Sequence, residues 1–342
     1  MNIRGKPTSL DIAHLAGVSQ PTVSRALRGS PSVNEETRRR ILAIAEQLNY
    51  KVDKNASNLR AQQSGTLALL FFEDPAPDES MINPFFHSML GSITRACARH
   101  GYDLLVSFQQ FSLDWHADFE DSHKADGLIL LGYGDYLQAR SRLEQLVAHG
   151  THFVRWGAVL PGQPGVSIGC DNFQGGLDMG RHLIGRGYRR IAFLGDATDH
   201  YPEFRERHRG LVQALAEAGL AADPALLQHA ISSEEAGHAA ASRLLEGGTS
   251  FDAVFAASDM IAIGALRALN EAGLRVPETI AVGGFDDIAM AESVWPALTT
   301  VKAGPFEMGC IAIKELVRQI EEPTLESRVC KVPTRLVVRE ST

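Results

Sequence analysis

From Gly65 onward the chain alternates short apolar runs with stretches of helical periodicity. Most of these runs are apolar throughout, a pattern typical of strands in a parallel sheet that helices cover on both faces. The helical stretches between them end repeatedly on glycine, which accepts the left-handed conformation that closes many helices. The predicted strands are 66–72, 103–106, 127–131, 153–156, 191–194, 253–256 and 280–282.

The alternating region is too long for a single sheet, so we expect two doubly wound α/β lobes. Residues 161–165, with the sequence Pro-Gly-Gln-Pro-Gly, make a natural break near its middle. Sheets of this kind bind small molecules at the carboxyl ends of their strands, and a cleft between two lobes collects such ends from both. This region is therefore a candidate ligand-binding body.

The first 50 residues have a different texture and predict three short helices. Each has one apolar stripe, and each follows a residue that can cap a helix. Between the first two, Gly17 permits a tight corner, which makes a helix-turn-helix pattern. The stripes are Ile12, Leu15 and Ala16, then Val23 and Leu27, then Ile41, Ile44, Ala45 and Leu48, and the caps are Thr8 or Ser9, Ser19 and Asn34.

Charge divides the chain near the same place. The sequence has 33 Lys and Arg against 41 Asp and Glu, a formal net charge of -8. The first 60 residues hold ten basic and five acidic side chains, or +5, which leaves 23 basic and 36 acidic ones, or -13, in the rest. A small basic head joined to a large acidic body points to nucleic-acid contact at one end.

Composition excludes a disordered or membrane-spanning chain. At 44% hydrophobic and 22% charged residues, it is that of a globular protein. The N-terminal residues lack the apolar core of a signal peptide, and no apolar run approaches the roughly 18 residues of a membrane span. We therefore expect a cytoplasmic protein with no membrane partner.

Metal, cofactor and catalytic sites are not indicated. The four cysteines are far apart and form no C-x-x-C pair, so we expect no metal site, no disulfide framework and no cofactor. The chain carries no G-x-S-x-G, H-E-x-x-H, P-loop or G-x-G-x-x-G motif. The sequence therefore predicts that the protein is not an enzyme.

Several segments resemble the lactose-repressor/galactose-repressor (LacI/GalR) family of bacterial transcription regulators. Residues 8–27, TSLDIAHLAGVSQPTVSRAL, with 33–38 and 48–50, resemble the family's headpiece. The resemblance spans essentially the whole chain, since the body carries GYRRIAFLG at 187–195, SDMIAIGAL at 258–266, VGGFDDI at 282–288, PALTTV at 296–301 and PTRLVVRES at 333–341.

The resemblance implies a small all-α headpiece and a two-lobed body similar to periplasmic binding proteins. The body would dimerise and hold an effector between its lobes. The implied domains are a helix-turn-helix headpiece at 1–52, a hinge helix or linker at 53–64, and an effector-binding and dimerisation domain at 65–342, with an N-lobe of about 65–162 and 300–325 and a C-lobe of about 163–299 and 326–342.

The second helix is the candidate reader of DNA. Its apolar residues Val23 and Leu27 face inward, which turns its polar face toward a major groove. Arginine can pair with guanine and glutamine with adenine, so Arg25 and Gln20 are the expected base readers; the alternative is a solvated polar face. Lys6, Ser19 and Arg38 to Arg40 are candidate phosphate contacts. The full candidate set on and after this helix is Ser19, Gln20, Pro21, Thr22, Ser24, Arg25 and Arg28.

The polar linker carries a second candidate DNA contact. Residues 55–61 match the family's hinge helix, which folds when two subunits meet on operator DNA and wedges a leucine into the minor groove. Here that leucine is Leu59, with Ala56 beside it. The alternative is that Leu59 packs against the headpiece.

The resemblance and the strand-end rule together select the candidate effector residues. Arg207 matches the family's effector-contacting arginine, and Asp286 ends a predicted strand. Carboxylates and guanidinium groups suit ligand hydroxyls, and aromatic rings can stack on a sugar. Alternatives remain for several members: core packing for the phenylalanines, an N-cap for Asp259 and a hinge role for the Asp171–Asn172 pair. The set is Phe85, Phe86, Trp156, Asp171, Arg207, Asp259 and Asp286, with Trp295 as a weaker aromatic candidate.

These features predict a homodimeric, sequence-specific transcription regulator that represses carbohydrate-utilisation genes from a pseudo-palindromic operator. A small sugar-like effector would control its affinity for DNA, with purine bases and sugar acids as alternative effectors. The protein would be cytoplasmic and nucleoid-associated when bound. The alternative, from a different class, is a solute-binding protein without DNA function. The complete headpiece pattern weighs against that alternative.

Overall fold

The computed structural model describes residues 7–27, 29–50, 63–71, 82–108, 114–231, 233–322 and 330–342. The chain divides into two compact units, Met1–Ser64 and Gly65–Thr342. We call them the headpiece and the body. None of the described helices is both long enough and apolar enough to cross a bilayer.

The headpiece contains the three predicted helices, each with the local signals that the sequence indicated. Thr8 caps the first helix through a capping box with Asp11, and Gly17 closes it at a φ of 63°. The Asn34 side chain accepts a hydrogen bond of 2.8 Å from the Thr37 backbone N–H. The helices are α1 (Ser9–Ala16), α2 (Gln20–Leu27) and α3 (Glu35–Gln47).

The headpiece core is small and draws on all three helices. Ile12, Val23 and Ile41 are completely buried at its centre. The prediction for Leu15 is wrong, since its side chain is 49% exposed. The buried stripe of α1 runs along Ile12, Ala13 and Ala16, and this leaves Leu15 on the solvent side.

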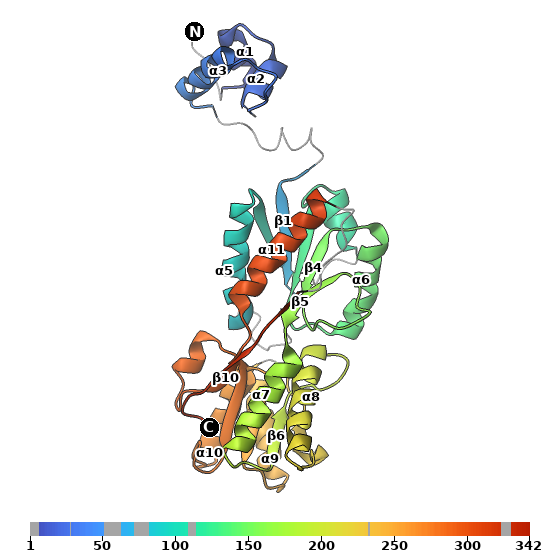
Figure 1. Ribbon diagram of the computed structural model, residues 1–342, viewed down its shortest axis with the longest axis vertical. Coiled ribbons are helices and arrows are strands. Elements are labelled where there is room, and N and C mark those ends of the chain that lie inside the picture. The colour runs from blue at the N-terminus through green and yellow to red at the C-terminus, as the bar shows by residue number, and fades with distance from the viewer. Residues whose placement is uncertain are drawn as a thin grey trace. The chain divides into compact units, whose positions relative to one another are not determined.

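The body has two lobes, each built on one six-stranded sheet. The N-lobe sheet has the strand order β11-β5-β4-β3-β1-β2, and its neighbouring strands are all parallel. Figure 1 shows α5 and α11 close together on this lobe, with α6 across the sheet from them. The N-lobe elements are β1 (Thr66–Phe71), α5 (Pro84–Arg99), β2 (Asp103–Phe108), a π-helical turn (His116–Asp121), β3 (Gly127–Leu131), α6 (Tyr136–His149), β4 (Phe153–Trp156), β5 (Val166–Cys170), α11 (Pro305–Glu321) and β11 (Cys330–Val332).

The central N-lobe strands are buried on both faces, as their continuous apolar runs predict. In β1, Leu67 and Leu69 join the core that α5 and α11 cover, while Ala68 and Leu70 join the core under α6. The edge strand β2 departs from this pattern, because β1 is its one neighbour among the strands of the described residues. Its apolar residues Leu105, Val106 and Phe108 are exposed.

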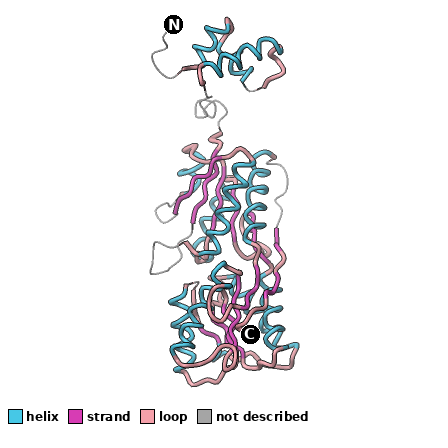
Figure 2. Tube along the Cα trace, turned by 90° about the vertical axis from the view of Figure 1, so that its left-hand side faces the viewer, coloured by secondary structure: helices cyan, strands magenta, loops and turns pink. Residues whose placement is uncertain are grey.

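The C-lobe repeats the architecture with a different edge. Its strand order is β12-β10-β9-β8-β6-β7, parallel throughout except for the β10–β12 pair. Figure 2 shows its strands flanked by helices. The C-lobe elements are α7 (Asn172–Gly185), β6 (Ile191–Leu194), α8 (Pro202–Glu217), a 3-10 turn (Pro224–Leu226), β7 (Leu227–Gln228), α9 (Glu234–Glu246), β8 (Ala253–Ala256), α10 (Asp259–Glu271), β9 (Ala281–Asp286), a second 3-10 turn (Ala289–Glu292), β10 (Thr299–Lys302) and β12 (Arg335–Val337).

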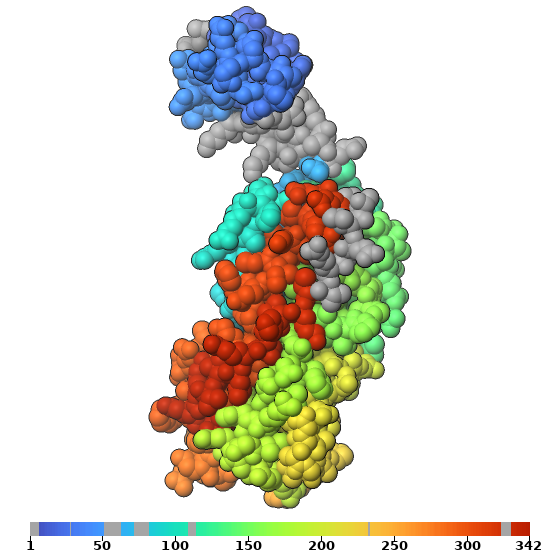
Figure 3. Space-filling view, viewed as in Figure 1, coloured from blue at the N-terminus to red at the C-terminus, as the bar shows by residue number. Residues whose placement is uncertain are grey.

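The described chain passes between the lobes after β5, after β10 and between β11 and β12. Figure 3 shows the C-terminal segment, in dark red, on the surface of both lobes. The expected lobe boundaries need correction: β5 and β11 complete the N-lobe sheet, and β10 belongs to the C-lobe sheet. The Pro-Gly segment 161–165 is a turn between β4 and β5 within the N-lobe, and the first passage lies at Cys170–Asn172.

Candidate functional site

The outer face of α2 presents the predicted DNA-reading residues. Val23 and Ala26 are buried against α1 and α3, which turns Pro21 and Arg25 to solvent. Ser19 is also exposed, and Gln20, Thr22 and Ser24 are half-buried at the edges of the same face. A short helix with one buried stripe and one polar face is the geometry that a recognition helix needs.

Local hydrogen bonds hold several of these side chains. The Ser19 and Thr22 hydroxyl oxygens lie 2.9 Å apart, and the Gln20 Nε2 donates a hydrogen bond of 3.1 Å to the Ser9 Oγ of α1. The Arg25 Nε donates at 3.3 Å to the Pro21 carbonyl of its own helix.

Arg38 does not have the free guanidinium that a phosphate contact would use. Its Nη2 donates at 2.6 Å to the Ser30 carbonyl, and its Nη1 lies 3.3 Å from the Glu35 carboxylate. Arg38 therefore fastens the loop between α2 and α3, while Arg39 and Arg40 remain exposed. The candidates Lys6, Arg28, Ala56 and Leu59 lie outside the described residues.

Five aromatic rings meet where the two lobes of the body touch. The Phe86, Tyr133 and Trp156 rings are mutually edge-on, with centroids 4.8 to 5.0 Å apart. Phe85 packs beside them with its centroid 5.7 Å from that of Trp156. These four belong to the N-lobe, and Phe204 of α8 reaches Tyr133 from the C-lobe at 5.0 Å. We call this set the aromatic cluster.

Arg207 lies directly behind the aromatic cluster and is completely buried. Its Nε donates at 2.9 Å to the Asn172 side-chain oxygen, and its Nη1 donates to the Ala257 carbonyl. The guanidinium carbon lies 3.7 Å from the centroid of the Phe285 ring. Held on three sides in this way, the side chain has a fixed direction.

Asp286 faces Arg207 and joins the lobes through Tyr133. Its Oδ1 lies 3.6 Å from the Arg207 Nη2, and the Tyr133 hydroxyl donates to its Oδ2 at 3.2 Å. Burial raises the pKa of Asp286 to about 7, although the positive charge of Arg207 and the Tyr133 hydroxyl act in the opposite direction. Asp286 is thus a hydrogen-bond acceptor whose ionised form is disfavoured by burial.

Two buried donors of this site have no hydrogen-bond partner among the described residues. They are the Trp156 Nε1 and the Arg207 Nη2. A buried donor left unsatisfied costs about 1 to 3 kcal/mol, so a ligand that brings acceptor oxygens to these atoms would recover that free energy.

The remaining predicted effector residues are placed differently. Asp259 is completely buried, but its carboxylate accepts hydrogen bonds from the Thr300 hydroxyl and the Ile288 backbone N–H. It is not the N-cap of α10 either, because Ser258 fills that position. Asp259 thus ties α10 to the neighbouring strands of its own lobe.

Asp171 and Asn172, at the first passage between the lobes, have different roles. Asn172 is buried and holds Arg207, as described above. Asp171 caps α7 by accepting a hydrogen bond of 3.1 Å from the Gln174 backbone N–H, and its other oxygen lies 3.2 Å from the Lys331 Nζ. No described contact joins Asp171 to the Arg207 site.

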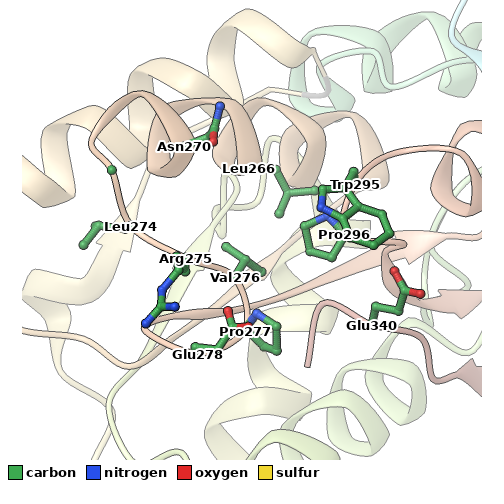
Figure 4. A pocket seen from close by; sticks show the side chains of 11 residues that line it. Leu266, Asn270, Leu274, Arg275, Val276, Pro277, Glu278, Trp295, Pro296 and Glu340 are labelled. Carbon is green, nitrogen blue, oxygen red and sulfur yellow. The ribbon is translucent and has the colours of Figure 1, made fainter.

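Trp295 lies on a separate pocket of the C-lobe. Its side chain is 86% exposed and stands beside Pro296 and Leu266 (Figure 4). The pocket has a volume of about 460 Å³ and shares no lining residue with the Arg207 site. Trp295 is therefore no part of the aromatic cluster. The rest of the lining comes from Asn270, Gly273, Leu274, Arg275, Val276, Pro277, Glu278 and Glu340.

Known proteins match both units of the chain. Residues 8–53 match the family described as bacterial regulatory proteins, lacI family, and residues 181–342 match the periplasmic binding protein-like domain. The chain is 31% identical to the HTH-type transcriptional regulator CelR of Thermobifida fusca over 346 residues, which cover 100% of both proteins. The chain belongs to the LacI family.

Other LacI-family proteins are similar over most of their length. The HTH-type transcriptional regulator AscG of Escherichia coli (strain K12) is 31% identical over 92% of this chain and 90% of its own. A solved complex of the regulator CelR with cellobiose has a TM-score of 0.74 at 30% identity, covering 98% of this chain and 100% of the other. A lac repressor dimer bound to operator and the anti-inducer ONPF shares the fold, with a TM-score of 0.82 at 23% identity and 98% and 99% coverage.

As a LacI-family member, the chain is a DNA-binding transcription regulator and not an enzyme, as the sequence predicts. The alternative of a solute-binding protein without DNA function is thereby set aside. Within the described ranges, no cluster of His, Cys, Asp or Glu side chains could hold a metal ion.

The sequence did not single out Tyr133 or Phe204, although both belong to the aromatic cluster. A signal for each is present in retrospect. Tyr133 follows the carboxyl end of a buried strand, the edge where α/β sheets bind ligands. Phe204 precedes Arg207 by three positions on α8, which puts both side chains on one helix face.

The raised pKa of Asp286 predicts how the stability of the protein depends on pH. Between pH values of about 4 and 7 the folded protein keeps a proton on Asp286 that the unfolded chain has released, so the free energy of unfolding falls as pH rises. Asp286→Asn removes the contribution of this one group to the pH dependence and keeps the other buried carboxyl, that of Asp259. Urea titrations across this range should show wild type losing stability relative to Asp286→Asn. A relative gain would mean that the pKa of Asp286 lies below that of the unfolded chain.

Proposed function

We propose that this regulator represses carbohydrate-utilisation genes and that a neutral, sugar-like effector bound beside Arg207 controls its affinity for operator DNA. The observation that carries the proposal is the fully buried network of Tyr133, Asp286 and Arg207, which joins the two lobes and in which the Arg207 Nη2, like the nearby Trp156 Nε1, makes no hydrogen bond to a described residue. A network of this kind can change when a ligand enters and can thereby change the lobe arrangement.

The DNA end of the proposal rests on α2. Its candidate contacts are Ser19, Gln20, Pro21, Thr22, Ser24 and Arg25. The regulator would act as a homodimer, because two headpieces related by a dyad read two half-sites of a pseudo-palindromic operator. It would reside in the cytoplasm and associate with the nucleoid when bound.

The proposed effector site beside Arg207 combines the faces of aromatic rings with polar groups. A solved relative at 30% identity is a complex with cellobiose, which makes a sugar the first class to test. Sugar hydroxyls can donate to the Asp286 carboxylate and accept from the Arg207 Nη2 and the Trp156 Nε1. Phe85, Phe86 and Trp156 would supply aromatic faces and edges for the apolar C–H groups of the ligand.

Coupling to DNA follows from the contacts between the lobes. An effector hydroxyl that binds Asp286 takes the position of the Tyr133 hydroxyl and frees the N-lobe from that link. The backbone contact from the Tyr136 N–H to the His200 carbonyl, at 2.9 Å, and the His200–Asp135 pair, at 2.8 Å, would then readjust. A ligand acts in this way only if it binds one lobe arrangement better than the other.

The experiment that tests the proposal is a gel-shift titration of the full chain against DNA upstream of its own and neighbouring genes. Binding should depend on an inverted repeat and weaken steeply with salt, because phosphate contacts release counterions. Sugars that raise the melting temperature of the protein should then change the DNA affinity. Binding that is insensitive to the repeat and to every such sugar contradicts the proposal.

Arg25→Ala is expected to weaken operator binding by about 1 to 3 kcal/mol and to relax the preference at one base pair in each half-site. Fluorescence anisotropy with operators changed at single positions measures both effects. An equal loss on every sequence would instead identify Arg25 as a phosphate contact. Arg243→Ala offers a control, since that arginine lies in the body and donates to the His229 carbonyl.

A further inference from the structure

A hydrogen bond between two helices holds the side chain at the start of the candidate recognition helix. The Gln20 Nε2 donates to the Ser9 Oγ at 3.1 Å, and both side chains are half-buried. Ser9 is the first residue of α1 and Gln20 is the first residue of α2. The contact therefore links the two helices of the helix-turn-helix on the side that carries the reading face.

Both ends of this contact are fixed by the local structure. Ser9 lies within the capping box, in which the Thr8 N–H and hydroxyl donate to the Asp11 carboxylate at 2.7 Å each. Gln20 follows Ser19, whose carbonyl accepts hydrogen bonds from the next turn of α2. A tether between two fixed backbones restricts the rotatable bonds of the glutamine side chain before any DNA is present.

The tether uses only part of the glutamine carboxamide. The group has two N–H donors and a carbonyl oxygen with two lone pairs, and Ser9 takes a single N–H. The second N–H and the oxygen stay available, and adenine pairs with this combination through its N7 acceptor and N6 donor. Holding a side chain in its binding orientation lowers the entropy cost of that pairing.

We propose that Ser9 is a positioning residue that holds the Gln20 carboxamide for reading an adenine in the operator. The inference rests on the proposed DNA-reading role of α2. Ser9 acts through Gln20, so its removal alters the preference at one base pair while the rest of the interface keeps its affinity.

The experiment begins by selecting operators for the full-length wild-type chain from a randomised inverted-repeat library. The position read by Gln20 is the one at which Gln20→Ala loses its base preference. Replacing adenine there by 7-deazaadenine, which lacks the N7 acceptor, should weaken wild-type binding about tenfold and Gln20→Ala binding hardly at all.

Ser9→Ala should reduce that tenfold penalty to about threefold or less, with unchanged preferences at all other positions. Ser9→Thr, which keeps the hydroxyl, should restore it, and Ser9→Ala should have no further effect in a Gln20→Ala background. Ser122→Ala removes an exposed hydroxyl from the body and serves as the control. Circular dichroism melting of each variant checks that the headpiece helices remain folded.

Three results overturn the proposal. The first is an equal weakening of all operators by Ser9→Ala, which would make Ser9 a phosphate contact. The second is a 7-deazaadenine penalty that Ser9→Ala leaves unchanged. The third is a preference of Gln20 for a base other than adenine. Failure of the proposed function gives a different result, because the wild-type selection would then enrich no inverted repeat at all.

Discussion

Gly176→Ala is expected to lower the free energy of unfolding of the body by about 3 kcal/mol or more. A Cβ at this position of α7 would lie 2.9 Å from the Arg207 Cα and 2.8 Å from its carbonyl carbon, and closer still to the carbonyl oxygen. Backbone atoms of α8 cannot rotate away, so the helices must separate. Chemical denaturation followed by circular dichroism measures the loss.

Gly185→Ala is the matched control, because it adds the same methyl group to the same helix. No heavy atom lies within 4 Å of a Cβ built at Gly185, and alanine is the better helix former. We expect this variant to be as stable as wild type or slightly more stable. If Gly176→Ala melted like Gly185→Ala, the close approach of α7 and α8 would be excluded. Gly176→Ala, but not Gly185→Ala, should also displace Arg207 and reduce the affinity for any effector.

Arg207→Met is expected to cost about 3 to 5 kcal/mol of stability and to abolish the response to effector. Methionine fills much of the space of the arginine stem, but it leaves the Asp286 carboxylate buried without its cation. It also removes the donors that hold Asn172 and the Ala257 carbonyl. Denaturant titration gives the first effect, and effector-dependent gel shift gives the second.

Arg209→Met, two positions further along α8, separates this effect from the loss of any arginine. Arg209 is exposed and pairs with Glu206 at 2.9 Å, so its removal should cost about 1 kcal/mol or less. Adding Asp286→Leu to Arg207→Met removes the buried acidic group that has lost its cation and should recover part of the lost stability. Equal losses for the two arginine variants would mean that Arg207 and Asp286 do not form a buried pair.

Local signals in the sequence predicted the headpiece and the central strands well. Thr8, Gly17 and Asn34 act within a few residues of themselves, so their capping roles can be read without knowing the fold. The same holds for β1 and β3, whose apolar runs require burial on both faces.

Features that depend on distant partners could not be predicted in the same way. Strand β11 has only three residues, and its place beside β5 depends on pairing across the whole body. Arg38 looks like any basic residue of a DNA-binding helix until the loop at Ser30 folds over it. The rule that ligands bind at strand ends correctly predicted that Asp286 and Phe85 lie at the boundary between the lobes. The hydrogen bond from the Tyr133 hydroxyl to Asp286 could not be predicted, because it depends on how the two lobes meet.

The passages of the chain between the lobes determine when the body can fold during synthesis. Strands β11 and β12, which form one edge of each sheet, both come from residues 330–337. Shortly afterwards, the Ser341 hydroxyl donates at 2.6 Å to the Val282 carbonyl inside the C-lobe. The ribosome therefore delivers the closing strands of both lobes within one stretch of eight residues, 330–337, and the two lobes become complete almost simultaneously rather than one after the other.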